Sequence, residues 1–255
     1  MRLLLIASSA MEFRFCARGR PARMQEEPDQ QVRPCGAEWH SARRLEIGAG
    51  AGAVRWARTI QLGGHDLLLV ANGVGARRAA SAVDAAAEAF QPDAVVSTGF
   101  CGALDPQLAV ADVVVATSIA AVDRRYDALP VATASPHHSG VVCSIDRVAQ
   151  TAEEKLRLRA GGAMVVEMEA AGVAARAQAR GLPFFCVKVV TDLAGETMAN
   201  DFNAALRADG HFDTMVVLRE ALRRPLVRVP ELCRLRQRSV RAARVLGDFI
   251  ADCRF

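Results

Sequence analysis

Two nearly apolar runs constrain the fold of this chain more than any other feature of its sequence. They are Arg2–Ser8 (RLLLIAS) and Phe184–Thr191 (FFCVKVVT), and neither alternates between apolar and polar residues. Near-continuous apolar strands are typical of sheets that are covered on both faces. We therefore expect both runs to lie inside a sheet with helices on its two sides.

The rest of the chain alternates between short strand patterns and helical patterns. Further strands are predicted at Val54–Leu62, Leu67–Ala71, Ala94–Ser97, Asp112–Thr117, Val141–Ser144 and Met164–Val166. Helices are predicted at Ala76–Phe90, near Asp146–Arg159, at Ala170–Arg180, and at about Asp201–Leu222 and Glu231–Ile250. This alternation predicts an α/β fold, a three-layer α/β/α sandwich with a mixed, largely parallel central sheet.

Length and spacing indicate one domain. The 255 residues show no internal repeat and no domain linker, so residues 1–255 are expected to form a single domain. Residues 223–255 are expected to be a basic C-terminal helical extension, with Arg223–Pro230 as a short connector before its helix. The polar segment Arg18–Arg55 is predicted to be a long loop or a hairpin.

Cysteine usage and the N-terminus favour a cytoplasmic protein. The seven cysteines are an odd number without a CxxC pair, which argues against both a disulfide framework and a metal site. The first ten residues lack the apolar region and cleavage site of a signal peptide. No run approaches the roughly 20 apolar residues that a membrane-spanning helix needs.

Positive charge is concentrated at the C-terminal end. From Arg223 to Phe255 nine arginines stand against three acids, a balance of +6, which leaves −2 for the remainder of a chain whose total is +4. Such a segment indicates either an anionic partner or, more commonly, a solvated helix face.

Ligands of open α/β sheets bind beyond the carboxyl ends of the strands, so polar residues that directly follow strands are candidates for a site. Asn72-Gly-Val-Gly75 opens a helix, but Arg78 occupies the place of the third glycine of a dinucleotide fingerprint, and a tight turn explains the motif as well. Thr98-Gly-Phe-Cys-Gly-Ala103 is predicted to be a glycine-containing turn, and its spacing fits equally a backbone that lies close to a ligand and a plain sheet-to-helix turn.

Acidic side chains follow three of the strands. Glu12 comes shortly after the first strand, Glu167 and Glu169 share one face of an extended segment, and Asp192 follows the second apolar run. Buried acids are costly without partners, which favours a functional role. Taken alone, Glu167 and Glu169 could cap the following helix, Asp192 could form an N-cap or an Asx turn, and Glu12 could be a surface residue.

Taken together and in order, these segments resemble the superfamily of purine nucleoside phosphorylases and methylthioadenosine/S-adenosylhomocysteine nucleosidases. The resemblance runs from the first strand to about Asp192–Gly195. It rests on Ala10-Met-Glu12, Asn72-Gly-Val-Gly75, Thr98–Leu104 with Asp112–Ala116, Val166-Glu-Met-Glu-Ala170 and Val190-Thr-Asp-Leu-Ala194. It implies the nucleoside phosphorylase-like fold and an enzyme that releases a purine base, most often adenine.

The resemblance also implies roles for individual residues. Asp192 is expected to protonate N7 of the purine, Glu169 to bind the ribose hydroxyls, and Glu12 to position or deprotonate a water molecule. The expected substrate-binding residues are completed by Met168, Glu167, Ser97, Thr98, Gly99, Phe100, Cys143 and Ser144.

The attacking group is left open by the sequence. Hexameric phosphorylases of the superfamily carry an arginine and a serine where this chain has Ser97 and Phe100, and the loss of both anion contacts favours hydrolysis without any cofactor. Phosphorolysis, with phosphate as co-substrate, is one alternative, and it includes a hopanoid-associated phosphorylase acting on adenosylhopane. A non-catalytic nucleoside-binding protein is the alternative from another class.

The expected partners are a small purine nucleoside and, by resemblance, further copies of the chain in a homo-oligomer, with no nucleic acid. Leu232, Leu235, Ala242, Leu246, Phe249 and Ile250 recur near helical spacing in the C-terminal segment. Such a basic amphipathic helix is able to contact an anionic membrane surface. Docking of this helix on the domain's own core is the favoured alternative.

Overall fold

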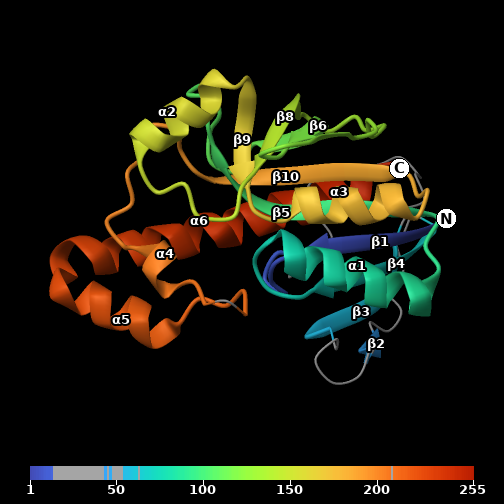
Figure 1. Cartoon of the computed structure of the whole chain (residues 1–255), viewed down its shortest axis with the longest axis horizontal. Helices are drawn as coiled ribbons and strands as arrows, with labels where there is room; N and C mark the ends of the chain where they lie inside the picture. The colour runs from blue at the N-terminus through green and yellow to red at the C-terminus, as the bar shows by residue number, and fades with distance from the viewer. Residues whose placement is uncertain (14–42, 45, 48–53, 63, 208) are drawn as a thin grey trace, which may run out of the picture.

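The structure is a computed structural model that describes residues 1–13, 43–44, 46–47, 54–62, 64–207 and 209–255. Its strands are β1 (Arg2–Ala7), β2 (Arg43–Arg44), β3 (Trp56–Leu62), β4 (His65–Ala71), β5 (Ala94–Ala103), β6 (Val113–Ala120), β7 (Arg125–Asp127), β8 (His138–Ser144), β9 (Ala163–Glu167) and β10 (Phe184–Asp192). Its helices are α1 (Ala76–Phe90), α2 (Ala152–Ala160), α3 (Ala170–Ala179), α4 (Phe202–Ala205), α5 (Thr214–Arg223) and α6 (Pro225–Asp252) (Figure 1). Most of the predicted segment Arg18–Arg55 lies outside the described residues.

The strands form one mixed sheet in the order β10-β6-β8-β9-β5-β1-β4-β3-β2. The two apolar runs, β1 and β10, both pair in parallel with β5, which confirms their central place. Because β10 also pairs with β6, the strands β5, β9, β8, β6 and β10 close a ring. The predicted mixed α/β architecture is confirmed, with this ring as an addition that strand patterns do not reveal.

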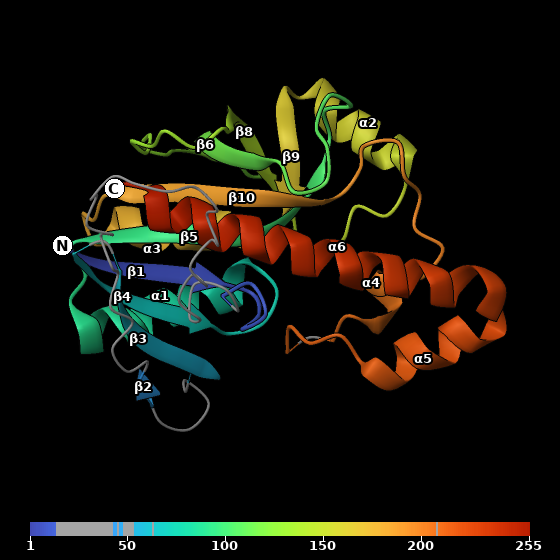
Figure 2. The same cartoon turned by 180° about the vertical axis from the view of Figure 1, so that it is seen from behind.

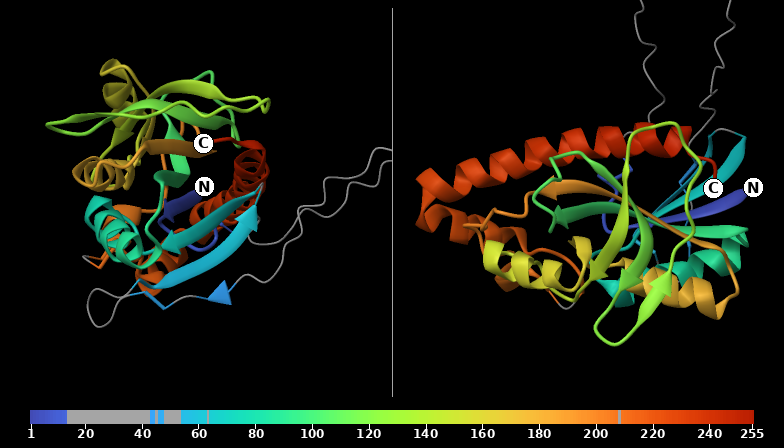
Figure 3. Two further views of the ribbon diagram at one scale, coloured as in Figure 1. Left: turned by 90° about the vertical axis from the view of Figure 1, so that its right-hand side faces the viewer. Right: turned by 90° about the horizontal axis from the view of Figure 1, so that it is seen from above.

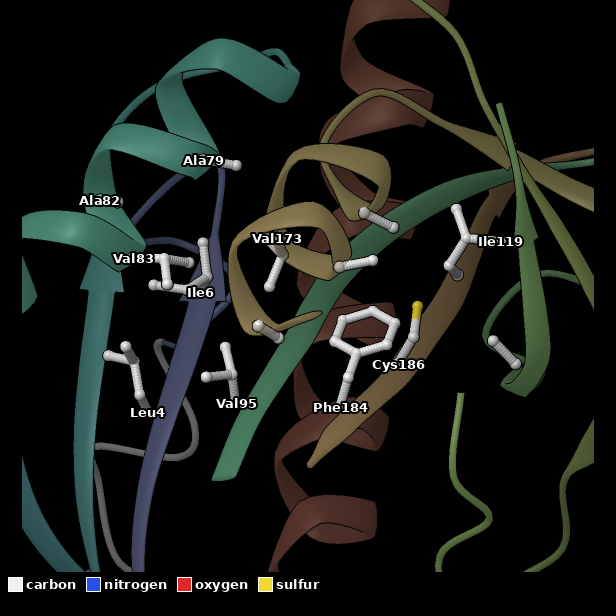
Figure 4. Close-up of a cluster of buried hydrophobic side chains, with 14 of the residues drawn as sticks. Leu4, Ile6, Ala79, Ala82, Val83, Val95, Ile119, Val173, Phe184 and Cys186 are labelled. Atoms are coloured by element: carbon white, nitrogen blue, oxygen red, sulfur yellow. The ribbon is translucent and has the colours of Figure 1, made fainter. Parts of the chain in front are cut away.

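Helices cover the sheet on both sides (Figures 1 and 2). On one face α1 and α3 pack over β1 and β5, and Figure 4 shows Ala79, Ala82 and Val83 of α1 against Leu4 and Ile6 of β1. On the other face the C-terminal half of α6 packs on the sheet through buried apolar side chains that include Ala242, Leu246, Phe249 and Ile250. They are four of the six residues of the predicted amphipathic face, and the other two, Leu232 and Leu235, are half-buried nearer the start of α6. The C-terminal part of that face therefore packs on the domain's own core.

Several predicted boundaries are wrong, among them the start of the helix expected near Asp146, which is Ala152 after its cap Thr151. Thr98–Ala103 is not a turn but the second half of β5, because its backbone pairs with β10 and, from Gly102, with β9. Helix 201–222 is divided into α4 and α5, each capped by its own aspartate, Asp201 or Asp213. The expected connector Arg223–Pro230 is helical from Pro225, since proline is well tolerated at the start of a helix.

Among the helices that the structure describes, none combines the length and hydropathy needed to cross a bilayer. The longest of them, α6, extends past the sheet, so that its first turns and α5 form a hairpin at one end of the molecule (Figures 1 to 3). That end is also the one at which β10 finishes and the chain turns toward α4.

Candidate active site

Three buried acids lie at one edge of the sheet. Glu12 follows β1, Glu169 directly precedes α3, and Asp192 is the last residue of β10. Their exposed fractions are only 2, 6 and 8%. Because β1 and β10 both run parallel to β5, the carboxyl ends of these strands meet at this edge.

Glu12 is held by a set of hydrogen-bond donors. Its Oε1 accepts from the hydroxyl of Ser8 at 2.5 Å and from the backbone N–H of Ser9 at 2.8 Å. Its Oε2 accepts from the N–H of Phe100 at 3.2 Å, which ties the turn after β1 to β5. Burial raises the pKa of Glu12, and the bond from Ser8 partly offsets that effect. A carboxylate with a raised pKa is a stronger proton acceptor than a free glutamate.

Two glycines of β5 make room for the acids. A Cβ atom at Gly99 would lie 1.8 Å from Oε2 of Glu12, and one at Gly102 would lie 2.8 Å from Oδ2 of Asp192. Glycine inside a strand often marks a place where another group approaches the backbone. Here the groups are the two acids of the site, so this one strand sets the positions of both carboxyls.

Glu167 and Glu169 have different environments although they share one face. Glu167 accepts from the N–H groups of Glu169 and Ala170 at the start of α3 and pairs with Lys188 at 2.8 Å. Both of its oxygens are thus occupied, so we propose that Glu167 anchors the site and is not the substrate ligand suggested by its spacing. Glu169 makes no cap bond to α3, and its Oε1 accepts from the N–H of Gly75 at 3.0 Å.

Burial, together with the negative charge of Glu167, raises the pKa of Glu169 to about 8. This environment favours the protonated form of Glu169. A neutral carboxyl both donates and accepts hydrogen bonds.

Asp192 is paired with a buried lysine. Lys155 of α2 is 0% exposed, and its Nζ lies 2.5 Å from Oδ2 of Asp192 and 2.7 Å from the carbonyl oxygen of Leu193. The other oxygen of Asp192 accepts from the hydroxyl of Thr191 at 3.2 Å. Burial raises the pKa of Asp192, and the ammonium group of Lys155 opposes that rise.

Lys188 is the second buried cation of the site. It lies in the middle of β10, is 0% exposed, and donates to the carbonyl oxygen of Thr98 at 3.2 Å in addition to its pair with Glu167. Its charge lowers the pKa values of Glu12 and Glu169, against the larger effect of burial. One lysine thus offsets part of the electrostatic cost of three neighbouring carboxyls.

The other predicted residues surround these groups in different ways. Ser97, Thr98 and Met168 are buried, and the hydroxyl of Thr98 has no hydrogen-bond partner among the described residues. Phe100 and Cys143 are half-buried. The hydroxyl of Ser144 accepts from the N–H of Ala171 at 3.2 Å, which gives it a structural contact at the start of α3.

Neither of the two lysines was predicted from the sequence to belong to the site. They are the only lysines in the chain, beside thirty arginines, since Lys and Arg together number 32. Lys188 carries a readable signal, because a cation inside an otherwise apolar strand requires a buried carboxylate. Lys155 carries no such signal. Its partner is 37 residues away, and only the tertiary fold brings the two together.

No group of three or more potential metal ligands is found among His, Cys, Asp and Glu of the described residues.

Comparison with known proteins decides the family. The family model described as "Phosphorylase superfamily" matches residues 46–134 and 128–217. The chain belongs to the phosphorylase superfamily. All of the site except Glu12 lies within the matched residues.

Curated relatives of this superfamily member include nucleosidases. The 5′-methylthioadenosine/S-adenosylhomocysteine nucleosidase of Tolumonas auensis is 27% identical over 176 residues, which cover 57% of this chain and 76% of the relative. The enzyme of the same name from Colwellia psychrerythraea is 28% identical over 193 residues, which cover 62% of this chain and 79% of the relative.

Solved structures share the fold of this superfamily member. The S-adenosylhomocysteine nucleosidase of Streptococcus pyogenes matches with a TM-score of 0.65 and 19% identity over 98% of this chain and 96% of that one. A futalosine hydrolase mutant of Helicobacter pylori matches with a TM-score of 0.64 and 14% identity over 98% of both chains. At these identities the likeness supports the fold alone.

Proposed function

We propose that this protein hydrolyses the N-glycosidic bond of an adenine nucleoside and releases the free base. The observation that carries this proposal is the pair of buried carboxyls, Glu12 and Asp192, held beside one strand by Gly99 and Gly102. The relatives named 5′-methylthioadenosine/S-adenosylhomocysteine nucleosidases are the reason for proposing the N-glycosidic bond as the bond that is cleaved and adenine as the base that is released. Two carboxyls in different environments are what an acid and a base in one reaction require.

Asp192 is the acid of the proposed reaction. As the C1′–N9 bond breaks, its electron pair moves onto the purine, and Asp192 donates a proton to N7. Burial helps Asp192 to hold that proton beforehand, and Lys155 at 2.5 Å stabilises the carboxylate that remains afterwards. A positioned acid of this kind contributes about 10²- to 10⁴-fold to the rate.

Glu169 and Glu12 act on the sugar and on the nucleophile. Glu169 binds the ribose hydroxyls through the oxygen that Gly75 leaves free, and Met168 packs beside the sugar. Glu12 accepts a proton from water as the water oxygen bonds to C1′ of the oxocarbenium-like sugar. The products are the free base and a sugar with a hydroxyl group at C1′. One proton has left Asp192 and one has been gained by Glu12.

Water is favoured over phosphate as the attacking group. Both lysines of the site are already paired, Lys155 with Asp192 and Lys188 with Glu167. Arg77, the second residue of α1 after the glycine turn, has an exposed side chain. We therefore propose hydrolysis with no co-substrate other than water. On the separate grounds of the family resemblance and of cysteine usage, we also propose a homo-oligomer in the cytoplasm.

The experiment is a panel of adenine nucleosides that differ at the 5′ position, each incubated with and without phosphate. Chromatography measures adenine and distinguishes the free sugar from a sugar 1-phosphate. We expect adenine and free sugar in both conditions. Strict dependence on phosphate would replace hydrolysis by phosphorolysis, and binding of the nucleosides without any adenine would indicate a non-catalytic binding protein.

A variant tests the role of Asp192 directly. Asp192→Asn keeps the shape of the side chain but cannot protonate N7, so we expect its turnover to fall by about 10²-fold or more. Asp112→Asn, on an aspartate just before β6, is the control and should keep its turnover. Near-wild-type turnover of folded Asp192→Asn would remove Asp192 from the mechanism.

A further inference from the structure

Exposed apolar side chains gather on the hairpin of α5 and α6. Of the eleven exposed large hydrophobic residues in the described chain, seven lie between Phe212 and Val229. We call six of them the apolar tip, namely Met215, Leu218, Leu222, Leu226, Val227 and Val229. Their exposed fractions reach 71% at Met215 and 91% at Leu226. Exposed apolar side chains that gather on one hairpin are typical of a place of interaction.

The apolar tip does not belong to the core of the domain. Met215, Leu218 and Leu222 follow one another at helical spacing and so share one face of α5, whereas Ala221 on another face is fully buried. On α6 the buried apolar residues begin at Ala242, well after Val229. The superfamily match ends at residue 217, so most of the apolar tip lies beyond it.

Charge identifies the kind of partner. Residues 214–236 hold six arginines and two acids. Glu220 already pairs with Arg223 and Arg228, and Glu231 is buried, where it accepts from the N–H groups of Ala199 and Asn200 at 2.8 Å. The arginines that remain, together with the apolar side chains, suit a surface that is apolar inside and negatively charged outside.

A second copy of the chain fits this surface less well. A two-fold contact places the same patch on both subunits, so it would bring together two surfaces that each carry six arginines and only two acids. Like charges across an interface oppose association. Arginines beside an anionic bilayer instead extend their guanidinium groups to the headgroups while the apolar side chains enter the acyl boundary.

We propose that the apolar tip docks this protein peripherally on an anionic lipid bilayer. Docking would also bring the active-site edge near the membrane, because an ion pair connects α6 to the segment that follows Asp192. Arg238 pairs with Glu196 at 2.7 Å, and Glu196 in turn accepts from the N–H of Leu193. The hairpin and the carboxyl end of β10 lie at the same end of the molecule (Figures 1 and 2).

The test is flotation of the full chain with vesicles of phosphatidylcholine alone or with 30% phosphatidylglycerol. We expect binding to the anionic vesicles that decreases in 0.5 M NaCl, as screening of charge requires. Leu226→Glu should weaken this binding at least about tenfold, because a charge then replaces the most exposed apolar side chain of the tip. Val122→Glu is the matched control, since Val122 is 96% exposed but lies far along the chain, after β6.

Each remaining outcome counts against the proposal. No binding to anionic vesicles at low salt overturns it, and so does equal loss of binding by Leu226→Glu and Val122→Glu. A wild-type dimer that Leu226→Glu converts to a monomer, measured by light scattering, would assign the tip to a second copy. Melting curves verify that both variants fold. The readout uses no catalysis, so it is independent of the proposed reaction.

Discussion

At the scale of residues, the proton of Asp192 is subject to two opposing effects, burial and the ammonium group of Lys155. Burial favours the neutral acid, whereas Lys155 favours the carboxylate and so makes the acid stronger. Without Lys155, the acid would keep its proton to a higher pH but would donate it less readily. In the proposed reaction the lysine would therefore influence both the rate and its dependence on pH.

Lys155→Met separates these effects. We expect turnover to fall about 10- to 100-fold and the alkaline limb of the pH profile to move up by about one unit or more. Arg157→Met, which removes an exposed cation from the same helix, is the control and should leave the profile in place. A purely structural role for Lys155 would reduce the amount of folded enzyme without moving the limb.

A substitution at Gly102 tests whether the space that this glycine leaves for the carboxyl of Asp192 is needed for activity. Its φ is not in the left-handed region, so alanine adds a Cβ without backbone strain, and that atom must displace the carboxyl of Asp192 from 2.8 Å. We expect Gly102→Ala to lower kcat by about ten- to a hundredfold, as small misplacements of a catalytic group do. Gly195→Ala, whose added Cβ meets no atom within 4 Å, should retain its kcat. Equal kcat values for the two variants would contradict this role of Gly102.

The acids of the site could be predicted, but their partners could not. Glu12, Glu169 and Asp192 follow strands, and the end of a strand is visible in a sequence. The pairing of Lys155 with Asp192 and the room left by Gly102 depend on which strands become neighbours. Glu167 lies two residues from Glu169, and this spacing suggested a shared role. In the structure only Glu167 accepts hydrogen bonds from the N–H groups at the start of α3, whereas Glu169 makes no such bond.

At the scale of elements, α6 has two halves with different environments, and they allow a matched comparison. Leu246 is fully buried against the sheet, whereas Leu226 on the same helix is 91% exposed. We expect Leu246→Ala to reduce the free energy of unfolding by about 2–5 kcal/mol, and Leu226→Ala to change it by no more than about 0.5 kcal/mol. Urea denaturation of both variants measures the difference. Comparable losses would mean that the tip, too, is part of the core.

Most helices and strands were predictable because their patterns are local. Helix α1 has the predicted bounds, Ala76–Phe90, and β10 extends the predicted strand by one residue. The wrong boundaries are those decided by distant pairing or by caps. Thr98–Ala103 contains two glycines and resembles a turn, yet hydrogen bonds from β10 and β9 keep it extended. Asp213 was an available signal for the start of α5, since its side chain accepts from Met215 and Val216.

At the scale of the whole molecule, the buried acids make stability depend on pH. The pKa values of Glu12, Glu169 and Asp192 are all raised by burial, so the folded chain holds protons that the unfolded chain releases. For Glu169 the window runs from its unfolded value of 4.5 to about 8. Its contribution to stability is fully present below that window and is lost as the pH rises through it. Burial opposes ionisation of Glu167 as well, but Lys188 keeps the pKa of Glu167 below 4.5. Glu167 therefore does not contribute to the loss of stability between pH 4.5 and about 8.

Glu169→Gln isolates the contribution of Glu169 to this pH dependence. The amide stays neutral at every pH, so the variant should lose less of its free energy of unfolding between pH 5 and pH 8 than the wild-type chain loses. Urea denaturation at pH 5, 6.5 and 8 measures both slopes, and Glu153→Gln, on an exposed carboxylate of α2, should keep the wild-type slope. If Glu169→Gln also kept that slope, Glu169 would be ionised in the folded chain. Its oxygens would then only accept hydrogen bonds from the ribose, and the neutral carboxyl assigned to it would be wrong.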